Sequence, residues 1–185
     1  MLRYKAYKYR IYPTIEQEIL IAKTIGCSRF IFNHFLAKWN ETYEQTGKGL
    51  TYSKCSAELP KMKKNEETAW LKEVDSIALQ ASLENLADSF SRFFKKQNQR
   101  PRFKSKSNPV QSYTTKNVNG SIELRDKIIK LPKLGLVKVK NSQDHNGRII
   151  NATIRKTVSG KFFVSLLVEK EIYPLPKTGR LLAST

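Results

Sequence analysis

The sequence predicts an α+β protein in which a helical lobe is inserted into a small antiparallel β-barrel. Apolar and basic residues alternate along residues 2–12, which is typical of a strand. Helical periodicity then dominates residues 14–97, and strand-like alternation returns between about residues 110 and 172. Because a lone N-terminal strand needs a pairing partner in a compact domain, we expect it to join the later strands. The four predicted helices are therefore an insertion after the first strand.

The N-terminal strand changes the face on which its apolar side chains lie. Leu2, Tyr4 and Ala6 share one face, whereas Tyr7, Tyr9 and Ile11 share the other. Such a phase slip is typical of a β-bulge or of a strand that crosses between two sheets, so we expect one of these at Ala6–Tyr7. Pro13 then ends the extended run.

Two helices with a turn between them are expected in residues 14–47. Thr14 and Gln17 have the spacing of a capping box, which marks a helix N-terminus. Gly26 is expected to break this helix, and a second helix is expected to end near Gly47. The segment therefore has the outline of a helix-turn-helix. Its three basic and four acidic residues suit a groove lined by phosphates poorly, so we interpret it as scaffold.

Two further helices complete the predicted lobe. A short one is expected from about Tyr52 to just before Pro60, and residues 61–68 are expected to form a polar connector. Ser76 is expected to cap the longest helix of the protein. The apolar residues of that helix recur at offsets of three and four: Leu79, Leu83, Leu86, Phe90 and Phe93.

Five strands are expected after the lobe, with a short hairpin connection at Ser159 and Gly160. Their ranges are 122–124, 127–131, 136–140, 149–158 and 161–168. The predicted division of the chain is a barrel (1–13 plus 110–172), a helical lobe (14–97), a basic connector (98–109) and a tail (173–185).

The positive charge of the chain is concentrated in one part of it. The formal net charge is +18, and residues 92–140 contribute +12 of it through fourteen Lys and Arg against two acidic residues. Residues 14–91, in contrast, hold nine basic and eleven acidic residues. A field this lopsided attracts a polyanion, because each cation that neutralises a phosphate releases condensed counterions. Nucleic acid is the expected partner.

Other classes of protein fit the sequence less well. No apolar run approaches the roughly 20 residues that span a bilayer, and charges interrupt the first ten residues where a signal peptide would be apolar. We therefore expect a cytoplasmic protein without a membrane partner. Cys27 and Cys55 have neither a CxxC partner nor a His at ligand spacing, so we expect two ordinary buried thiols and no metal or other cofactor.

The residues expected to bind phosphates begin where the lobe meets the barrel. They are Arg92, Lys95, Lys96, Arg100, Arg102, Lys104 and Lys106, followed by Lys116 and Lys133, together with Arg3, Lys5, Lys8 and Arg10 of the first strand. Phe103 lies among them and is expected to stack on bases or ribose. Phe93 and Phe94 are also interleaved with these cations, but we expect both to lie in the core.

Seven segments of the chain, in this order, resemble the TnpB family. They are Tyr9–Thr14, Phe32–Asn33, Trp70–Ser76, Pro101–Lys106, Ser112–Thr115, Lys130–Gly135 and Ser165–Glu169. The family, also called OrfB, is encoded by insertion sequences and is related to type V CRISPR effectors. The resemblance runs from about Leu2 to Gly179. It implies an RNA-guided DNA nuclease in which a wedge-type barrel, interrupted by a helical recognition lobe, precedes a RuvC-like domain with a zinc ribbon. The implied partners are guide RNA and duplex DNA.

The resemblance also implies that the lobe and the barrel read a short motif beside the DNA target. Six residues are candidates for this reading: Tyr52 with Ser56, Ser76 with Gln80, and Thr114 or Thr115. The first two pairs have i, i+4 spacing and so share a helical face. The Gln80 amide can bond an adenine edge, and a Thr methyl can contact a thymine methyl. A role as a cap or a polar surface position fits each of them equally well.

The sequence departs from the family near its end. In the family the first catalytic Asp follows the segment that resembles Pro176–Gly179, but here no Asp or Glu follows Glu171. Cleavage by two metal ions needs several converging carboxylates, and the cysteines of the zinc ribbon are missing as well. We therefore assign no catalytic residue and expect no nuclease activity from this chain alone.

The sequence leads to one hypothesis and two alternatives. The hypothesis is the nucleic-acid-binding N-terminal part of a TnpB-like protein. The first alternative is one half of a split endonuclease, completed by a separate RuvC-containing chain. The second is a non-functional remnant of a decayed element, in which apolar surface near Ile172–Leu182 would be exposed.

Overall fold

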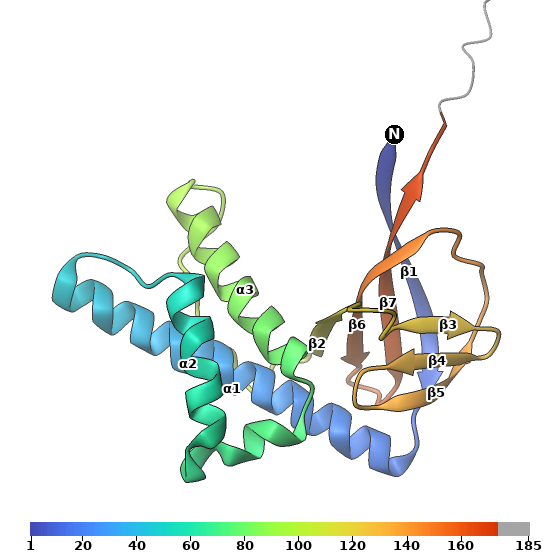
Figure 1. Ribbon diagram of the computed structural model, residues 1–185, viewed down its shortest axis with the longest axis horizontal. Helices are drawn as coiled ribbons and strands as arrows, with labels where there is room; N and C mark the ends of the chain where they lie inside the picture. The colour runs from blue at the N-terminus through green and yellow to red at the C-terminus, as the bar shows by residue number, and fades with distance from the viewer. Residues whose placement is uncertain (174–185) are drawn as a thin grey trace, which may run out of the picture.

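A computed structural model describes residues 1–173 as a helical lobe beside a curved β-sheet (Figure 1). The elements follow in the order β1 (Leu2–Tyr12), α1 (Ile15–Thr46), α2 (Tyr52–Lys64), the 3-10 helix η1 (Glu66–Glu73), α3 (Ser76–Phe94), β2 (Gln111–Lys116), β3 (Glu123–Arg125), β4 (Ile128–Leu131), β5 (Gly135–Lys140), β6 (Arg148–Lys156) and β7 (Phe162–Glu171). The α+β class and the insertion of the helices after the first strand are confirmed. The predicted tail lies, apart from its first residue, outside the described part of the chain.

The seven strands form one antiparallel sheet in the order β2-β6-β7-β1-β5-β4-β3. β1 lies at its centre, paired along its length with β7 and at its end with β5, so the predicted pairing of the first strand with later ones is confirmed. The predicted closed barrel is wrong, because β2 and β3 are edges that do not pair with each other. Side chains of α1 and α3, namely Ile21, Ile25 and Ala78, complete the core that a closed barrel would bury by itself.

β1 runs without the expected irregularity. Its pairing with β7 keeps a single register, so the phase slip predicted at Ala6–Tyr7 is absent. Leu2, Tyr4 and Ala6 stay exposed because, in this single register, they share the outward face of β1 with Lys8 and Arg10, opposite the buried Tyr7, Tyr9 and Ile11. Among the described strand pairs a register shift occurs instead in β6, between Ile149 and Asn151.

α1 is one unbroken helix of 32 residues, so the predicted turn at Gly26 is wrong. The capping box at its start is confirmed, and Gly47 ends it in the left-handed conformation, with φ of 66°. Gly26 lies where α1 passes from one core to the other: Ile25 belongs to the sheet core, and Cys27 belongs to the lobe core. Packing on both sides holds the helix together although glycine lowers its intrinsic stability.

The other helices differ from prediction at their ends. α2 continues one turn past Pro60, and η1 occupies part of the expected polar connector. α3 is shorter than α1, and its N-cap is Asp75 rather than Ser76, because the Asp75 carboxylate accepts the Ile77 N–H at 2.9 Å. The strand β2 was not predicted, because its alternate residues are Ser and Thr rather than apolar side chains.

Two hydrophobic cores result, one in the sheet and one in the lobe. Both cysteines are buried free thiols, as predicted, and burial raises the pKa of each to about 11. Phe94 is 61% exposed, and the half-buried Phe93 belongs to neither core, so the predicted place of both in the core is wrong. Along residues 1–173 no helix has an apolar stretch long enough to cross a membrane.

Candidate nucleic-acid interface

The register of the sheet brings cations from three strands, and an aromatic side chain from a fourth, together on its outer face. Arg155 pairs with Phe163, Phe163 with Arg10, and Arg10 with Lys140, so the four side chains form one row across β6, β7, β1 and β5. Lys8 lies in the adjoining row, because it pairs with Ser165. We call Lys8, Arg10, Lys140, Arg155 and Phe163 the outer-face row.

Aromatic rings hold the central cations of this row in place. The Lys8 Nζ atom lies 4.5 Å from the centroid of the Phe163 ring, and the Arg10 guanidinium carbon lies 5.4 Å from it. The Arg10 guanidinium also lies 5.2 Å from the centroid of the Tyr12 ring. Each such contact contributes about 0.5–1 kcal/mol at an exposed site. The rings therefore orient the cations without neutralising them.

The positive charges of the outer-face row are not neutralised by acidic side chains within residues 1–173. Within residues 1–173, none of its four cations forms an ion pair, and the Arg10 Nε atom is buried without a hydrogen-bond partner. On β7, the nearest acidic residue of this face is Glu169, six residues from Phe163. Glu169 accepts a hydrogen bond from the Tyr4 hydroxyl at 3.0 Å and pairs with Arg148 at 4.0 Å. A buried donor without a partner is costly, and an anion placed on this row would satisfy it.

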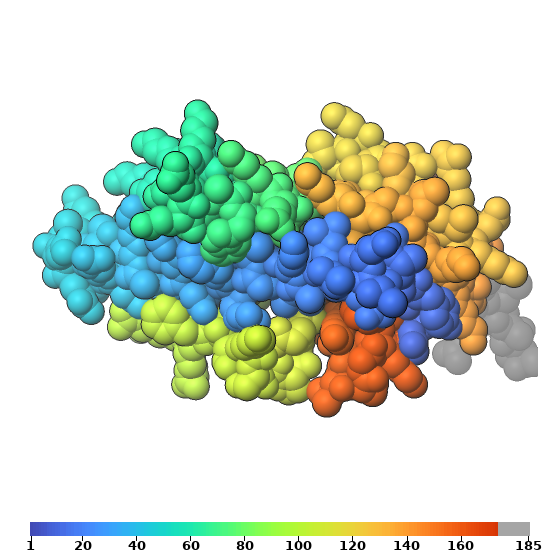
Figure 2. Space-filling view, turned by 90° about the horizontal axis from the view of Figure 1, so that it is seen from below, coloured from blue at the N-terminus to red at the C-terminus, as the bar shows by residue number. Residues whose placement is uncertain are grey.

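The basic connector between α3 and β2 lies against α1. The Asn33 side chain clamps its backbone, donating to the Lys104 carbonyl at 2.9 Å and accepting the Lys104 N–H at 2.8 Å. The Lys104 ammonium lies 4.1 Å from the centroid of the Phe32 ring, and burial lowers its pKa. Figure 2 shows this yellow-green segment and the orange-red residues of β7 along the same side of the blue α1. The connector and this part of β7 therefore lie on the same side of α1 in this view (Figure 2).

The structure separates the predicted phosphate-binding residues into several environments. Lys95, Lys96, Arg102, Phe103 and Lys106 are exposed on the end of α3 and the connector, and Lys133 is exposed in the β4–β5 turn. Arg92 pairs with Asp88 at 2.9 Å, Lys116 pairs with Glu84 at 2.5 Å, and Arg100 donates to Asn40 at 2.9 Å. Arg3 and Lys5 lie on the opposite face of β1 from Lys8 and Arg10. Sequence reasoning missed Lys140, Arg155 and Phe163, which only the strand register brings beside Arg10.

The residues predicted to read bases are also dispersed. Thr115 is buried and donates to Asp75 at 2.5 Å, so its side chain cannot reach a thymine methyl. Ser76 accepts from Lys63 at 2.6 Å, and Thr114 bonds Thr153 at 2.8 Å. Tyr52 packs against the lobe core, Ser56 is half-buried, and Gln80 is exposed.

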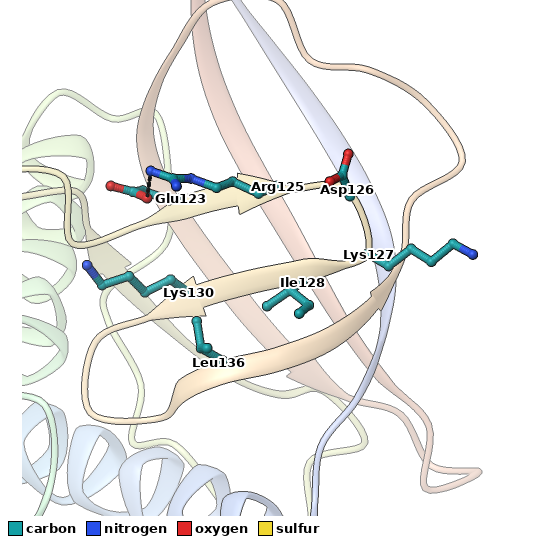
Figure 3. Close-up of a pocket in the computed structure, with 7 residues that line it drawn as sticks. All are labelled: Glu123, Arg125, Asp126, Lys127, Ile128, Lys130 and Leu136. Carbon is teal, nitrogen blue, oxygen red and sulfur yellow. Dashed lines mark ion pairs between the residues drawn. The ribbon is translucent and has the colours of Figure 1, made fainter.

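A separate groove of about 700 Å³ lies on β3, β4 and β5 (Figure 3). Its lining residues are Glu123, Arg125, Asp126, Lys127, Ile128, Lys130 and Leu136. Arg125 pairs with Glu123 at 2.9 Å, and the exposed Ile128 and Leu136 make part of the surface apolar. Because charges of both signs mix here, this groove suits a polyanion less well than the outer-face row does.

Comparison with known proteins finds similar sequences for this chain. A family model described as a helix-turn-helix domain, that of OrfB proteins of the IS605 type, matches residues 1–48, which here form β1 and α1. The "Putative RNA-guided DNA endonuclease InsQ" of Escherichia coli (strain K12) is 33% identical over 172 residues, which are 93% of this chain and 42% of that protein. A "Putative RNA-guided DNA endonuclease" of Streptomyces pristinaespiralis is 34% identical over 179 residues, covering 94% of this chain and 44% of that protein.

A third relative, the "Virulence protein VsdF" of Salmonella dublin, is 36% identical over 97 residues, covering 49% of this chain and 82% of that protein. The chain spans less than half the length of the two endonuclease-named relatives, whose N-terminal part it matches. It belongs to the TnpB (OrfB) family.

Proposed function

We propose that this chain binds the nucleic acids of an RNA-guided DNA endonuclease, guide RNA and target DNA, through their phosphates. The observation that carries the proposal is the outer-face row, in which Lys8, Arg10, Lys140 and Arg155 lie on one face of the sheet and form no ion pair within residues 1–173. Two relatives whose names describe RNA-guided DNA endonucleases match nearly the whole chain, which supports the same assignment. The sheet corresponds in this proposal to a wedge-type domain and α1–α3 to a recognition lobe.

We further propose that residues 1–173 bind nucleic acid without hydrolysing it. Carboxylates of the lobe have structural partners: Glu73 pairs with Lys23 at 2.7 Å, Glu58 pairs with Lys38 at 2.5 Å, and Asp75 caps α3. Two-metal cleavage needs carboxylates that converge on the ions instead. Mixing the protein with guide RNA, Mg²⁺ and a separate RuvC-containing chain tests whether such a partner completes a nuclease.

Binding measured against salt concentration tests the phosphate interface. The probes are a 20-nucleotide single-stranded RNA and a 20-base-pair DNA duplex, and the face variant carries Lys8→Gln, Arg10→Gln, Lys140→Gln and Arg155→Gln. The log–log slope is about −0.7 per phosphate contact for single strands and about −0.9 for duplex DNA. If each of the four cations contacts one phosphate, the face variant should therefore bind the RNA with a slope shallower by up to about 3.

The matched control carries Lys48→Gln, Lys54→Gln, Lys61→Gln and Lys72→Gln. These four lysines are exposed on the lobe and form no ion pair within residues 1–173. The control removes the same charge, so it isolates the position of the cations from the net charge. Equal losses of affinity in the two variants, or a flat slope for the unmodified protein, would reject the proposed interface.

A further inference from the structure

An aromatic pocket of about 250 Å³ is lined by residues from the C-terminal parts of α1 and α3. These parts of the two helices lie at the end of the lobe away from the sheet (Figure 1). Its lining includes Trp39 and Tyr43 of α1 and Phe90 and Phe94 of α3, and its polar groups come from Asn40 and Arg100. The pocket therefore combines flat apolar surfaces with a cation and an amide.

The pocket has a rigid floor and open walls. Trp39 and Phe90 are buried and stack on each other, with centroids 4.4 Å apart and planes inclined by 12°. Phe94 is inclined by 24° to Phe90, with the two centroids 6.3 Å apart, and 61% of its surface is exposed. Tyr43 is 49% exposed. Two large aromatic side chains exposed at a cavity indicate a surface for a flat partner.

The charge beside the pocket identifies the kind of partner. Arg100 lies in the wall, and its guanidinium donates to the Asn40 side-chain oxygen at 2.9 Å. Lys95 and Lys96 follow α3 directly and form no ion pair within the described residues. A partner that is both flat and anionic fits this combination, and a nucleotide has both properties.

We propose that this pocket holds one unstacked base of single-stranded nucleic acid, with the neighbouring phosphates on Arg100 and the lysines after α3. The inference rests on the proposed function and adds to it a contact with a base. The base stacks on Phe94 and Tyr43. The NH₂ group of Asn40 makes no hydrogen bond within residues 1–173 and so remains free to donate to the base edge.

The test compares strands with and without bases. The probes are a 12-nucleotide oligoadenylate as RNA, the same sequence as DNA, and a 12-nucleotide DNA strand in which every site is abasic. The unmodified protein should bind both base-bearing strands more tightly than the abasic strand. Phe94→Ala and Tyr43→Ala should each weaken binding of the base-bearing strands by roughly 5- to 100-fold, leave the abasic strand unaffected and leave the salt slope unchanged.

Two control variants separate stacking from folding. Tyr173→Ala removes an exposed aromatic side chain two residues after β7 and should bind all three strands as the unmodified protein does. Phe94→Tyr keeps a flat ring and should retain most of the affinity. Equal binding of abasic and base-bearing strands by the unmodified protein would overturn the base pocket while leaving the phosphate interface standing. Absence of binding to every strand at low salt would overturn both proposals.

Discussion

Replacing Gly26 with alanine tests whether α1 is one helix. In a helix interior alanine is more favourable than glycine by about 0.8–1.0 kcal/mol. A Cβ placed on Gly26 would meet no side chain or other segment of the described residues within 4 Å, so neither a clash nor a new tertiary contact changes this value. The free energy of unfolding should therefore rise by about 0.5–1 kcal/mol, part of it through the lower entropy of the unfolded chain. For a chain of this size the melting temperature should rise by about 2–4 °C per kcal/mol.

The measurement is urea unfolding followed by circular dichroism at 222 nm, with the dependence on urea fitted separately for each protein. Gly47→Ala is the matched control, because Gly47 ends the same helix with φ of 66°. Alanine is strained at that φ, so this variant should lose about 1 kcal/mol. Opposite signs at the two glycines are the expected result. A loss of stability at Gly26 would instead place the residue in a turn, as the helix-turn-helix interpretation requires, and would refute the continuous helix.

Further measurements test single residues of the fold. Thr115→Val should destabilise the protein by about 1–3 kcal/mol in urea unfolding, because it leaves the buried Asp75 carboxylate without its hydroxyl donor, and an unchanged stability would contradict that contact. Lys96→Gly should stabilise the protein by about 0.5–1 kcal/mol, since Lys96 has φ of 58°; destabilisation would argue for a side-chain contact. Because burial raises the pKa of Cys27 and Cys55 from 9.0 to about 11, the stability they contribute is complete below pH 9 and is lost as the pH rises through 11. At pH 8 both should react with iodoacetamide at least 10-fold more slowly in the folded than in the urea-unfolded protein, and equal rates would contradict their burial.

The sequence predicted which segments are helices and strands better than it predicted where helices break and how the sheet closes. The apolar face of α3 and the alternation of β4 to β7 are local patterns, so they could be recognised without neighbours. The turn predicted at Gly26 was wrong because glycine breaks a helix only where tertiary packing does not stabilise it. Here both hydrophobic cores pack against α1. Barrel closure could not be predicted, because it depends on whether the edge strands meet, and Ile21, Ile25 and Ala78 occupy the core instead.

The candidate site was predictable in its charge and not in its geometry. Counting Lys and Arg finds the excess of positive charge, but ion pairs decide which of these cations are free to bind phosphates. Arg92 is paired with a residue one turn earlier on the same helix, and Lys116 is paired with Glu84, which is distant in the sequence. Arg155 and Arg10 become neighbours only through the register of β6, β7 and β1. A register is fixed by pairing between distant segments, so the outer-face row has no signature in the local sequence.

α1 connects the sheet that carries the outer-face row to the part of the lobe that contains the aromatic pocket. The Gly26→Ala variant therefore also tests whether nucleic-acid binding depends on the rigidity of α1. Ile21 and Ile25 anchor the first half of α1 in the sheet core, and Trp39 lies both in the lobe core and in the floor of the aromatic pocket. The separation of the outer-face row from the pocket is therefore set by the straightness of one helix, and Gly26 is the position where that helix is weakest. If a single strand contacts both surfaces on a rigid frame, Gly26→Ala should gain stability and keep its affinity for RNA long enough to span them. A variant that gains stability but loses affinity only for long strands would mean that binding requires α1 to bend at Gly26.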